Sequence, residues 1–161
     1  MATRTPLVMV AGNIQQLQAG DTIVVAASTY TSRSETNGEA SVAVVIGAPV
    51  YSSAAGSVKR AQANALSTAR VAGLGMDTSI AAAAAGNILT GGTLVATTAQ
   101  WDAVAGTTGG LAFGAVYYLD PTTAGKITST APTTVGQVVT EIGVALSTTE
   151  LDVNVKTPVL L

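Results

Sequence analysis

The sequence predicts an all-β protein: a small N-terminal β arm followed by two similar lobes, each built like a β-barrel or a β-sandwich. Three observations support this prediction. Short runs rich in Val, Ile, Thr and Tyr recur at close spacing, with Gly, Ala and Ser between them. One pattern of such runs occurs twice along the chain. One short helix is expected near residues 99–105, where both a start and a stop signal are present.

The N-terminal arm, residues 1–27, contains three short apolar runs separated by turn-like residues. These runs lie at 6–10, 13–17 and 22–27, and each is long enough for one strand. The stretch that follows, STYTSRSETNGEA at 28–40, is polar and contains a glycine. We therefore predict that residues 28–40 form a linker between the arm and the rest of the chain.

The first lobe is predicted over residues 41–96, where short β-rich runs follow one another. The expected strands lie at 41–46, 49–52, 57–61, 69–76 and 93–97. The alanine run at 80–86 favours a helix by propensity, but it is too short to form a stable helix alone. We expect it to form a single turn packed on the sheet.

The second lobe is predicted over residues 97–161 and includes the helix at 99–105. Thr98 can cap the N-terminus of this helix, and Gly106 lies where a C-terminal stop belongs. The face expected to pack on the sheet carries Trp101, Val104 and Ala105.

The two lobes share a pattern of glycines and tyrosines. Identical residues coincide when GAPVYSSAAGSVKRAQA (47–63) is aligned with GAVYYLDPTTAGKITST (114–130). The matched pairs in these segments are Gly47 with Gly114 and Tyr51 with Tyr118 at an offset of 67, and Gly56 with Gly125 at 69. Further along, VAGLG (71–75) aligns with EIGVA (141–145), with Gly73 over Gly143 at an offset of 70. The pattern predicts a duplicated unit: a β-hairpin, a polar connection and a strand containing a glycine. Chance similarity in a chain rich in Ala and Gly is the alternative.

The sequence AGKIT at 124–128 invites comparison with a phosphate-binding loop, in which a lysine follows a glycine-rich turn. The motif for such a loop is G-x-x-x-x-G-K-[ST]. Here Asp120 occupies the position of the first glycine, Ile127 replaces the hydroxyl residue, and a strand rather than a helix is expected to follow. Gly125 is therefore interpreted as a turn residue that permits a positive φ, in the same role as Gly56.

The sequence offers no combination of residues typical of an active site. Cysteine and histidine are absent, which removes thiolate ligands, disulfides and the commonest general base. The carboxylates are distributed over separate elements. Glu150 and Asp152 share one face of the strand ELDVNV, where exposure to solvent is expected and a calcium site is the alternative. The residues of this strand expected to face inward are Leu151, Val153 and Val155.

Three tyrosines, Tyr51, Tyr117 and Tyr118, lie in predicted strands. Packing across strands is the expected role, and a ligand-binding aromatic patch is the alternative. From these patterns we predict a non-enzymatic protein with no cofactor and no bound metal.

Charge limits the partners that the chain can have. Charged residues make up 10% of the sequence, far below the roughly 25% of an ordinary soluble domain, so contacts between subunits are expected to cover much of the surface. The net charge is −2 and the seven basic residues are scattered, which argues against binding to nucleic acid. No apolar run reaches 18 residues, so no membrane span is expected.

Residues 97–161 resemble a module of bacteriophage virion proteins. The likeness rests on the Gln-Trp-Asp helix, the TGGL…G…YYL segment, the AGKIT…AP hairpin, the G…V…IGVALS…L strand and the terminal PVLL. Modules of this kind occur in head decoration (cement) proteins and in tail-fibre or head-fibre proteins. The first lobe, over 47–89, is similar to the decoration pattern, whereas 3–23 resembles segments of tail-fibre and collar proteins.

The resemblance implies a structural role without catalytic residues. It implies a homotrimer that binds the major capsid protein, stabilises the head surface, and is made in the bacterial host cytoplasm before joining the virion. A short tail-fibre, head-fibre or collar component with an adhesion or adaptor role is the alternative.

Attachment is assigned to the N-terminal arm, because its few apolar residues are too few for a core of its own. The candidate attachment residues are Leu7, Met9, Ile14, Leu17, Ile23 and Val25. The arm is expected either to engage a neighbouring subunit or the capsid, or to add strands to its own first lobe.

Overall fold

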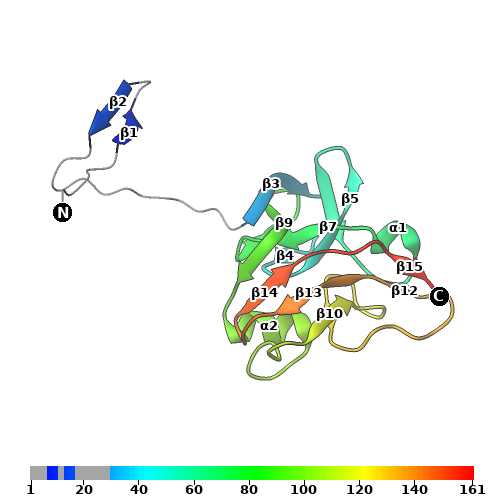
Figure 1. Ribbon diagram of the computed structural model, residues 1–161. Coiled ribbons are helices and arrows are strands. Elements are labelled where there is room, and N and C mark those ends of the chain that lie inside the picture. The colour runs from blue at the N-terminus through cyan, green and yellow to red at the C-terminus, as the bar shows by residue number, and fades with distance from the viewer. Residues whose placement is uncertain (1–6, 11–12, 17–29) are drawn as a thin grey trace.

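The computed structural model describes residues 7–10, 13–16 and 30–161 (Figure 1). Strands dominate these residues, which confirms the predicted all-β class. The strands are β1 (Leu7–Val10), β2 (Asn13–Gln16), β3 (Tyr30–Asn37), β4 (Val44–Val45), β5 (Pro49–Ala54), β6 (Ser57–Arg60), β7 (Val71–Gly75), β8 (Ser79–Ile80), β9 (Ala85–Val95), β10 (Val116–Leu119), β11 (Ile127–Thr128), β12 (Val138–Val139), β13 (Glu141–Ala145), β14 (Glu150–Val153) and β15 (Val159–Leu160). The helices are α1 (Leu66–Ala69) and α2 (Thr98–Ala105).

Nine strands form one sheet in the order β11-β10-β13-β14-β9-β3-β6-β5-β7. An additional pairing between β9 and β7 closes the last five of these strands into a barrel. The other four strands continue outward from β9, which is eleven residues long and pairs with β14 at its C-terminal end. β9 therefore connects the strands of the two lobes within this one sheet. In the rest of the described chain, β1–β2, β4–β8 and β12–β15 form two-stranded pairs.

The duplicated unit is present in the strand pairing. In the first lobe Val50 pairs with Gly73, and in the second lobe Tyr117 pairs with Gly143. These are the partners that the sequence alignment makes equivalent. The register shift also falls at the same place, directly after Val50 in one lobe and directly after Tyr117 in the other. This agreement in register is what a duplicated unit predicts.

The two lobes share their larger buried cluster. The smaller cluster belongs to the first lobe and consists of Val44, Ala48, Val50, Val58, Ile80 and Ile88. The larger cluster is drawn from both lobes and includes Leu74, Leu89, Leu94, Trp101, Tyr117, Leu119, Ile142 and Leu151. Trp101 of α2 lies directly against Gly47, where an added Cβ would be 2.8 Å from the indole ring. The lobes predicted on either side of residue 96 are therefore in direct contact and share one core.

Backbone hydrogen bonds also connect the lobes. The N–H of Ala63 donates to the carbonyl of Asp120 at 3.0 Å, and the N–H of Gly125 donates to the carbonyl of Ala61 at 2.8 Å. A third bond runs from the N–H of Val138 to the carbonyl of Ala63 at 2.9 Å. The segment after β6 is thus held by the second lobe.

The prediction of a linker over 28–40 is wrong for most of its length. Residues Tyr30–Asn37 form β3, which pairs with β9 and, at its end, with β6. The first five side chains of β3 are exposed, so this part of the strand has no apolar face that the sequence could reveal. Hydrogen bonds to β9, rather than side-chain burial, hold it in the sheet.

Two other predictions for the first lobe need correction. The alanine run at 80–86 does contain a turn, but β9 already begins at Ala85, and the strand expected at 93–97 is only the end of β9. In the run 41–46 only Val44 and Val45 form a strand. Isolated propensity failed here because neighbouring strands set the limits of these elements.

Helix α2 confirms the predicted helix and corrects its cap. The N-cap is Thr97 rather than Thr98, and its side-chain oxygen accepts a hydrogen bond from the N–H of Gln100. The Gln100 side chain in turn accepts the backbone N–H of Thr97 at 2.8 Å, which completes a capping box. Gly106 ends the helix in a left-handed conformation, as predicted.

Candidate functional site

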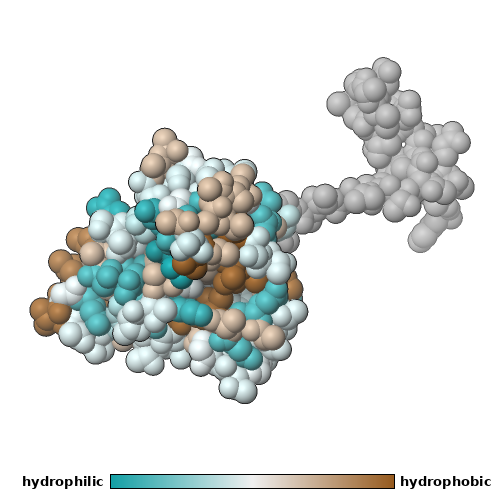
Figure 2. All heavy atoms as spheres, turned by 180° about the vertical axis from the view of Figure 1, so that it is seen from behind, coloured by the Kyte–Doolittle hydropathy of each residue, from teal (hydrophilic) through white to brown (hydrophobic). Residues whose placement is uncertain are grey.

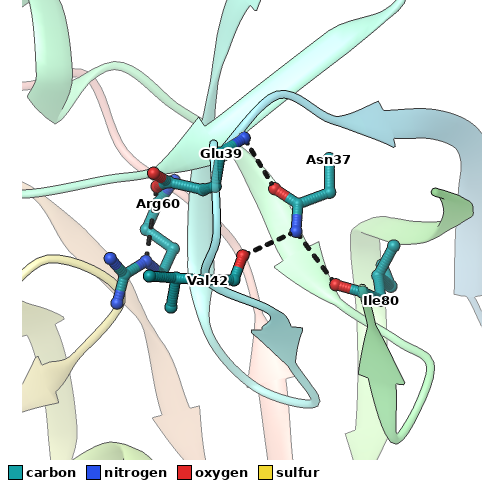
Figure 3. A network of polar contacts seen from close by, with 5 residues as sticks. All are labelled: Asn37, Glu39, Val42, Arg60 and Ile80. Carbon is teal, nitrogen blue, oxygen red and sulfur yellow. Dashed lines mark hydrogen bonds and ion pairs between the residues drawn. The ribbon is translucent and has the colours of Figure 1, made fainter. Parts of the chain in front are cut away.

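A polar network joins the end of β3 to β6, to β8 and to the segment before β4 (Figure 3). The side chain of Asn37 is fully buried, and its amide nitrogen donates to the carbonyls of Val42 and Ile80, both at 2.9 Å. Its side-chain oxygen accepts the backbone N–H of Glu39 at 3.0 Å. Both amide hydrogens and the oxygen are engaged, so Asn37 fixes the chain between β3 and β4 and has no donor left for a ligand.

The same network includes an ion pair (Figure 3). Glu39 Oε1 accepts the backbone N–H of Arg60 at 3.0 Å and Arg60 Nε at 3.3 Å. The stem of Arg60 packs on Gly125 of the second lobe, where an added Cβ would lie 2.9 Å from Arg60 Cδ. Arg60 thus connects the network to the turn that follows β10, and its role is structural.

The Gln-Trp-Asp motif of α2 also serves the fold. Gln100 completes the capping box, and buried Trp101 donates its indole N–H to the carbonyl of Thr149 at 3.0 Å. Asp102 accepts the backbone N–H of Gly110 at 2.7 Å, that of Gly109 at 3.0 Å, and the hydroxyl of a threonine in the same loop. Each residue of the motif is used to position α2 on the sheet or to close the loop after it.

We predict that Asp102→Asn destabilises the protein at neutral pH and has less effect in acid. The N–H of Gly110, the N–H of Gly109 and the hydroxyl of Thr107 together hold the pKa of Asp102 below its ordinary value, although desolvation opposes them. The carboxylate's stabilisation is therefore complete above the ordinary pKa of aspartate and is lost as the pH falls through the lowered, folded-state pKa. Denaturant titrations at pH 7 and in acid measure the difference. The control is Asp152→Asn, because the Asp152 side chain is exposed on β14. An equal loss at both pH values contradicts the prediction.

The Gly-Lys turn has the geometry of a scaffold. Gly125 has a φ of 76°, and Gly56, its equivalent in the first lobe, has a φ of 70°. The carboxylate of Asp120 accepts the N–H groups of Thr122 and Thr123 at 2.6 and 2.7 Å. The ammonium of Lys126 donates to the carbonyl of Ala103 in the last turn of α2. The sequence-based interpretation of Gly56 and Gly125 as turn residues with positive φ is confirmed.

The tyrosines and carboxylates that the sequence singled out as possible ligand-binding residues are either dispersed or part of the core. Tyr117 is fully buried and its hydroxyl accepts the N–H of Ala112 at 3.0 Å, whereas Tyr51 and Tyr118 are half-buried. Tyr51 also packs against the shared core. On β14 Asp152 is exposed and Glu150 half-buried, while the inward positions Leu151 and Val153 are buried as predicted. Within the described residues, no three acidic side chains come together in a group that could hold a metal ion.

A shallow groove lies where β9 passes from one lobe to the other. It has a volume of about 480 Å³ and is lined by Tyr30, Met76, Leu89, Thr93, Leu94, Val95, Leu146 and Glu150. Val95 and Leu146 on its wall are 59% and 45% exposed. Apolar side chains gather in patches on one face of the described part of the chain (Figure 2). A groove with one carboxylate among apolar side chains suits an apolar protein segment rather than a charged ligand.

Half of the predicted attachment residues fall within the described strands. Leu7 and Met9 lie on β1, and Ile14 lies on β2 directly opposite Met9 in the antiparallel pair. Leu17, Ile23 and Val25 lie outside the described residues. The attachment role of all six stays a prediction.

No protein-family model matches this chain, and no curated protein or solved structure matches it. Neither α1 nor α2, the helices of the described residues, is long and apolar enough to cross a membrane.

Proposed function

We propose that this chain is a non-enzymatic structural protein of a bacteriophage virion, and that it decorates the capsid and stabilises the head surface. The observation that carries the proposal is the contrast between polar groups inside and apolar groups outside. Every buried side-chain nitrogen or oxygen in the described residues has a hydrogen-bond partner. Apolar side chains such as Val135 and Phe113 are 88% and 81% exposed. Contact between surfaces is the function that such a molecule supports best.

The roles of the motif residues support the same proposal. The segments that resemble phage modules contain the Gln-Trp-Asp helix, the Gly-Lys turn and the strand with Gly143, and each is used to build the fold. A module whose motif residues serve its shape rather than any chemistry is what a capsid-binding block requires. The partner that the resemblance implies is the major capsid protein.

We expect the protein to form a homotrimer. Few charged residues and several exposed apolar side chains make an isolated subunit prone to unwanted pairing, which symmetric contacts between subunits would prevent. Sedimentation at micromolar concentration measures the oligomeric state. A compact monomer would contradict the expectation for the free protein.

We predict that the purified full chain binds capsids that lack it, and that a variant without residues 1–27 folds but does not bind. The arm carries the predicted attachment residues, and its β1–β2 pair is too small to be stable alone. Co-sedimentation with capsids measures binding, and circular dichroism measures folding. A truncated protein that binds as well as the full chain would exclude the arm as the attachment element.

Imaging of virions tests the location. Density between capsomers supports a head decoration protein, whereas density at the tail or collar supports the short-fibre or collar alternative. Virions without any added density at either place would overturn the proposed function as a whole.

A further inference from the structure

The apolar groove beside Tyr30, the first residue of β3, is close in sequence to an apolar segment, residues 22–27. Residues 22–27 have the sequence TIVVAA, which is apolar at both odd and even positions and carries no charge. A strand of this kind requires cover on both faces, unlike a strand with one polar face. Ala27 is three residues before Tyr30, which lines the groove, so an extended chain can span about 10 Å between them.

Pairing of this segment with its own β3 is disfavoured. A hairpin between 22–27 and β3 would use Ser28-Thr29 as a two-residue loop, and such loops prefer Gly, Asn or Asp. In addition, the first five side chains of β3 are all exposed. A strand laid beside β3 would therefore gain no apolar layer on either face.

The groove can cover one face of this segment. Leu89 and Leu94 form a buried floor, while Val95 and Leu146 stand exposed on the wall. Its volume of about 480 Å³ is in the range of pockets that enclose several apolar groups, roughly 300–1,000 Å³. The groove also lies at the start of β3, where residue 29 joins the described chain.

We propose that residues 22–27 of the same chain dock into this groove, with the side chains of Ile23 and Val25 against Val95 and Leu146. Docking in this way anchors the base of the N-terminal arm on β9, the strand that both lobes share, and leaves β1–β2 to reach a partner. The proposal does not depend on the proposed phage function.

Cysteine cross-linking tests the docking, because the natural sequence contains no cysteine. The full chain carrying Val25→Cys and Val95→Cys is oxidised, and the products are separated on a denaturing gel without reductant. The matched control carries Val25→Cys and Val135→Cys, since Val135 is a still more exposed valine that does not line the groove. We expect a disulfide within one chain for the first pair and little or none for the control.

A third variant separates docking from mere proximity. Leu146→Glu is added to the Val25→Cys and Val95→Cys pair; it leaves the chain tether unchanged but puts a charge on the groove wall. Leu146 is 45% exposed, so the fold is expected to survive, which circular dichroism checks. We expect the cross-linking rate to fall about tenfold, as a loss of apolar burial would require. Equal rates for the groove and control pairs, cross-links formed only between two copies, or a rate unaffected by Leu146→Glu would each overturn the proposal.

Discussion

Gly143→Ala is expected to destabilise the protein by about 3 kcal/mol, the upper end of the usual cost of overpacking. An added Cβ at Gly143 would lie 2.0 Å from the backbone oxygen of Asp152 on the neighbouring strand. The obstacle is backbone, so no side-chain rotation can relieve it, and β13 and β14 must separate. An added Cβ at Gly73, the equivalent glycine of the first lobe, would lie 2.2 Å from the carbonyl oxygen of Leu89. Gly73→Ala is therefore expected to destabilise the protein to a similar extent.

The matched control is Gly91→Ala in β9 of the same sheet. There the nearest atoms to an added Cβ are 3.5 Å and 3.9 Å away, which is ordinary contact. The change at Gly91 is expected to be neutral or slightly stabilising, because alanine restricts the unfolded chain. Denaturant unfolding of the three variants measures the effects. If Gly143→Ala cost no more than Gly91→Ala, the close approach of β13 and β14 would be wrong.

Asn37→Asp is expected to lower the free energy of unfolding by about 3–5 kcal/mol at neutral pH, which is the usual effect of removing one partner from a buried charged or polar network. The change is nearly isosteric, but it replaces a donor of two hydrogen bonds by a carboxylate oxygen. That oxygen would face the carbonyls of Val42 and Ile80, each 2.9 Å from the nitrogen it replaces. Burial without a donor disfavours the charged form, so the variant's folded-state pKa is expected to rise above the unfolded value.

The pH dependence of this variant has a definite sign. A raised folded-state pKa means that the charge penalty is fully present above that pKa and is relieved below the unfolded pKa, where the acid is neutral in both states. The Asn37→Asp variant should therefore recover part of its stability as the pH falls. Asn64→Asp is the control, because Asn64 is exposed and its side-chain oxygen accepts the hydroxyl of Thr68, a bond that a carboxylate retains. Equal stability of both variants at pH 7 would contradict the role of Asn37.

The sequence by itself determined the features that local chemistry controls. Glycines with positive φ set the hairpin turns at Gly56 and Gly125, and a left-handed Gly106 ends α2. Alternation of polar and apolar residues predicted the inward face of β14. The repeated pattern was visible because identical glycines and tyrosines recur at nearly constant offsets. These signals involve residues close together in the chain, so no knowledge of distant partners was required.

The tertiary structure decided what depends on partners far away in the sequence. Polar β3 is a strand because β9, more than fifty residues later, supplies its hydrogen bonds, as in the pairing of Arg33 with Ile88. Asn37 is buried because Val42 and Ile80 offer carbonyls to its amide. The groove exists because β9 is shared between the lobes. Backbone hydrogen bonds and buried amides carry no apolar pattern, and only the folded arrangement shows which groups they meet.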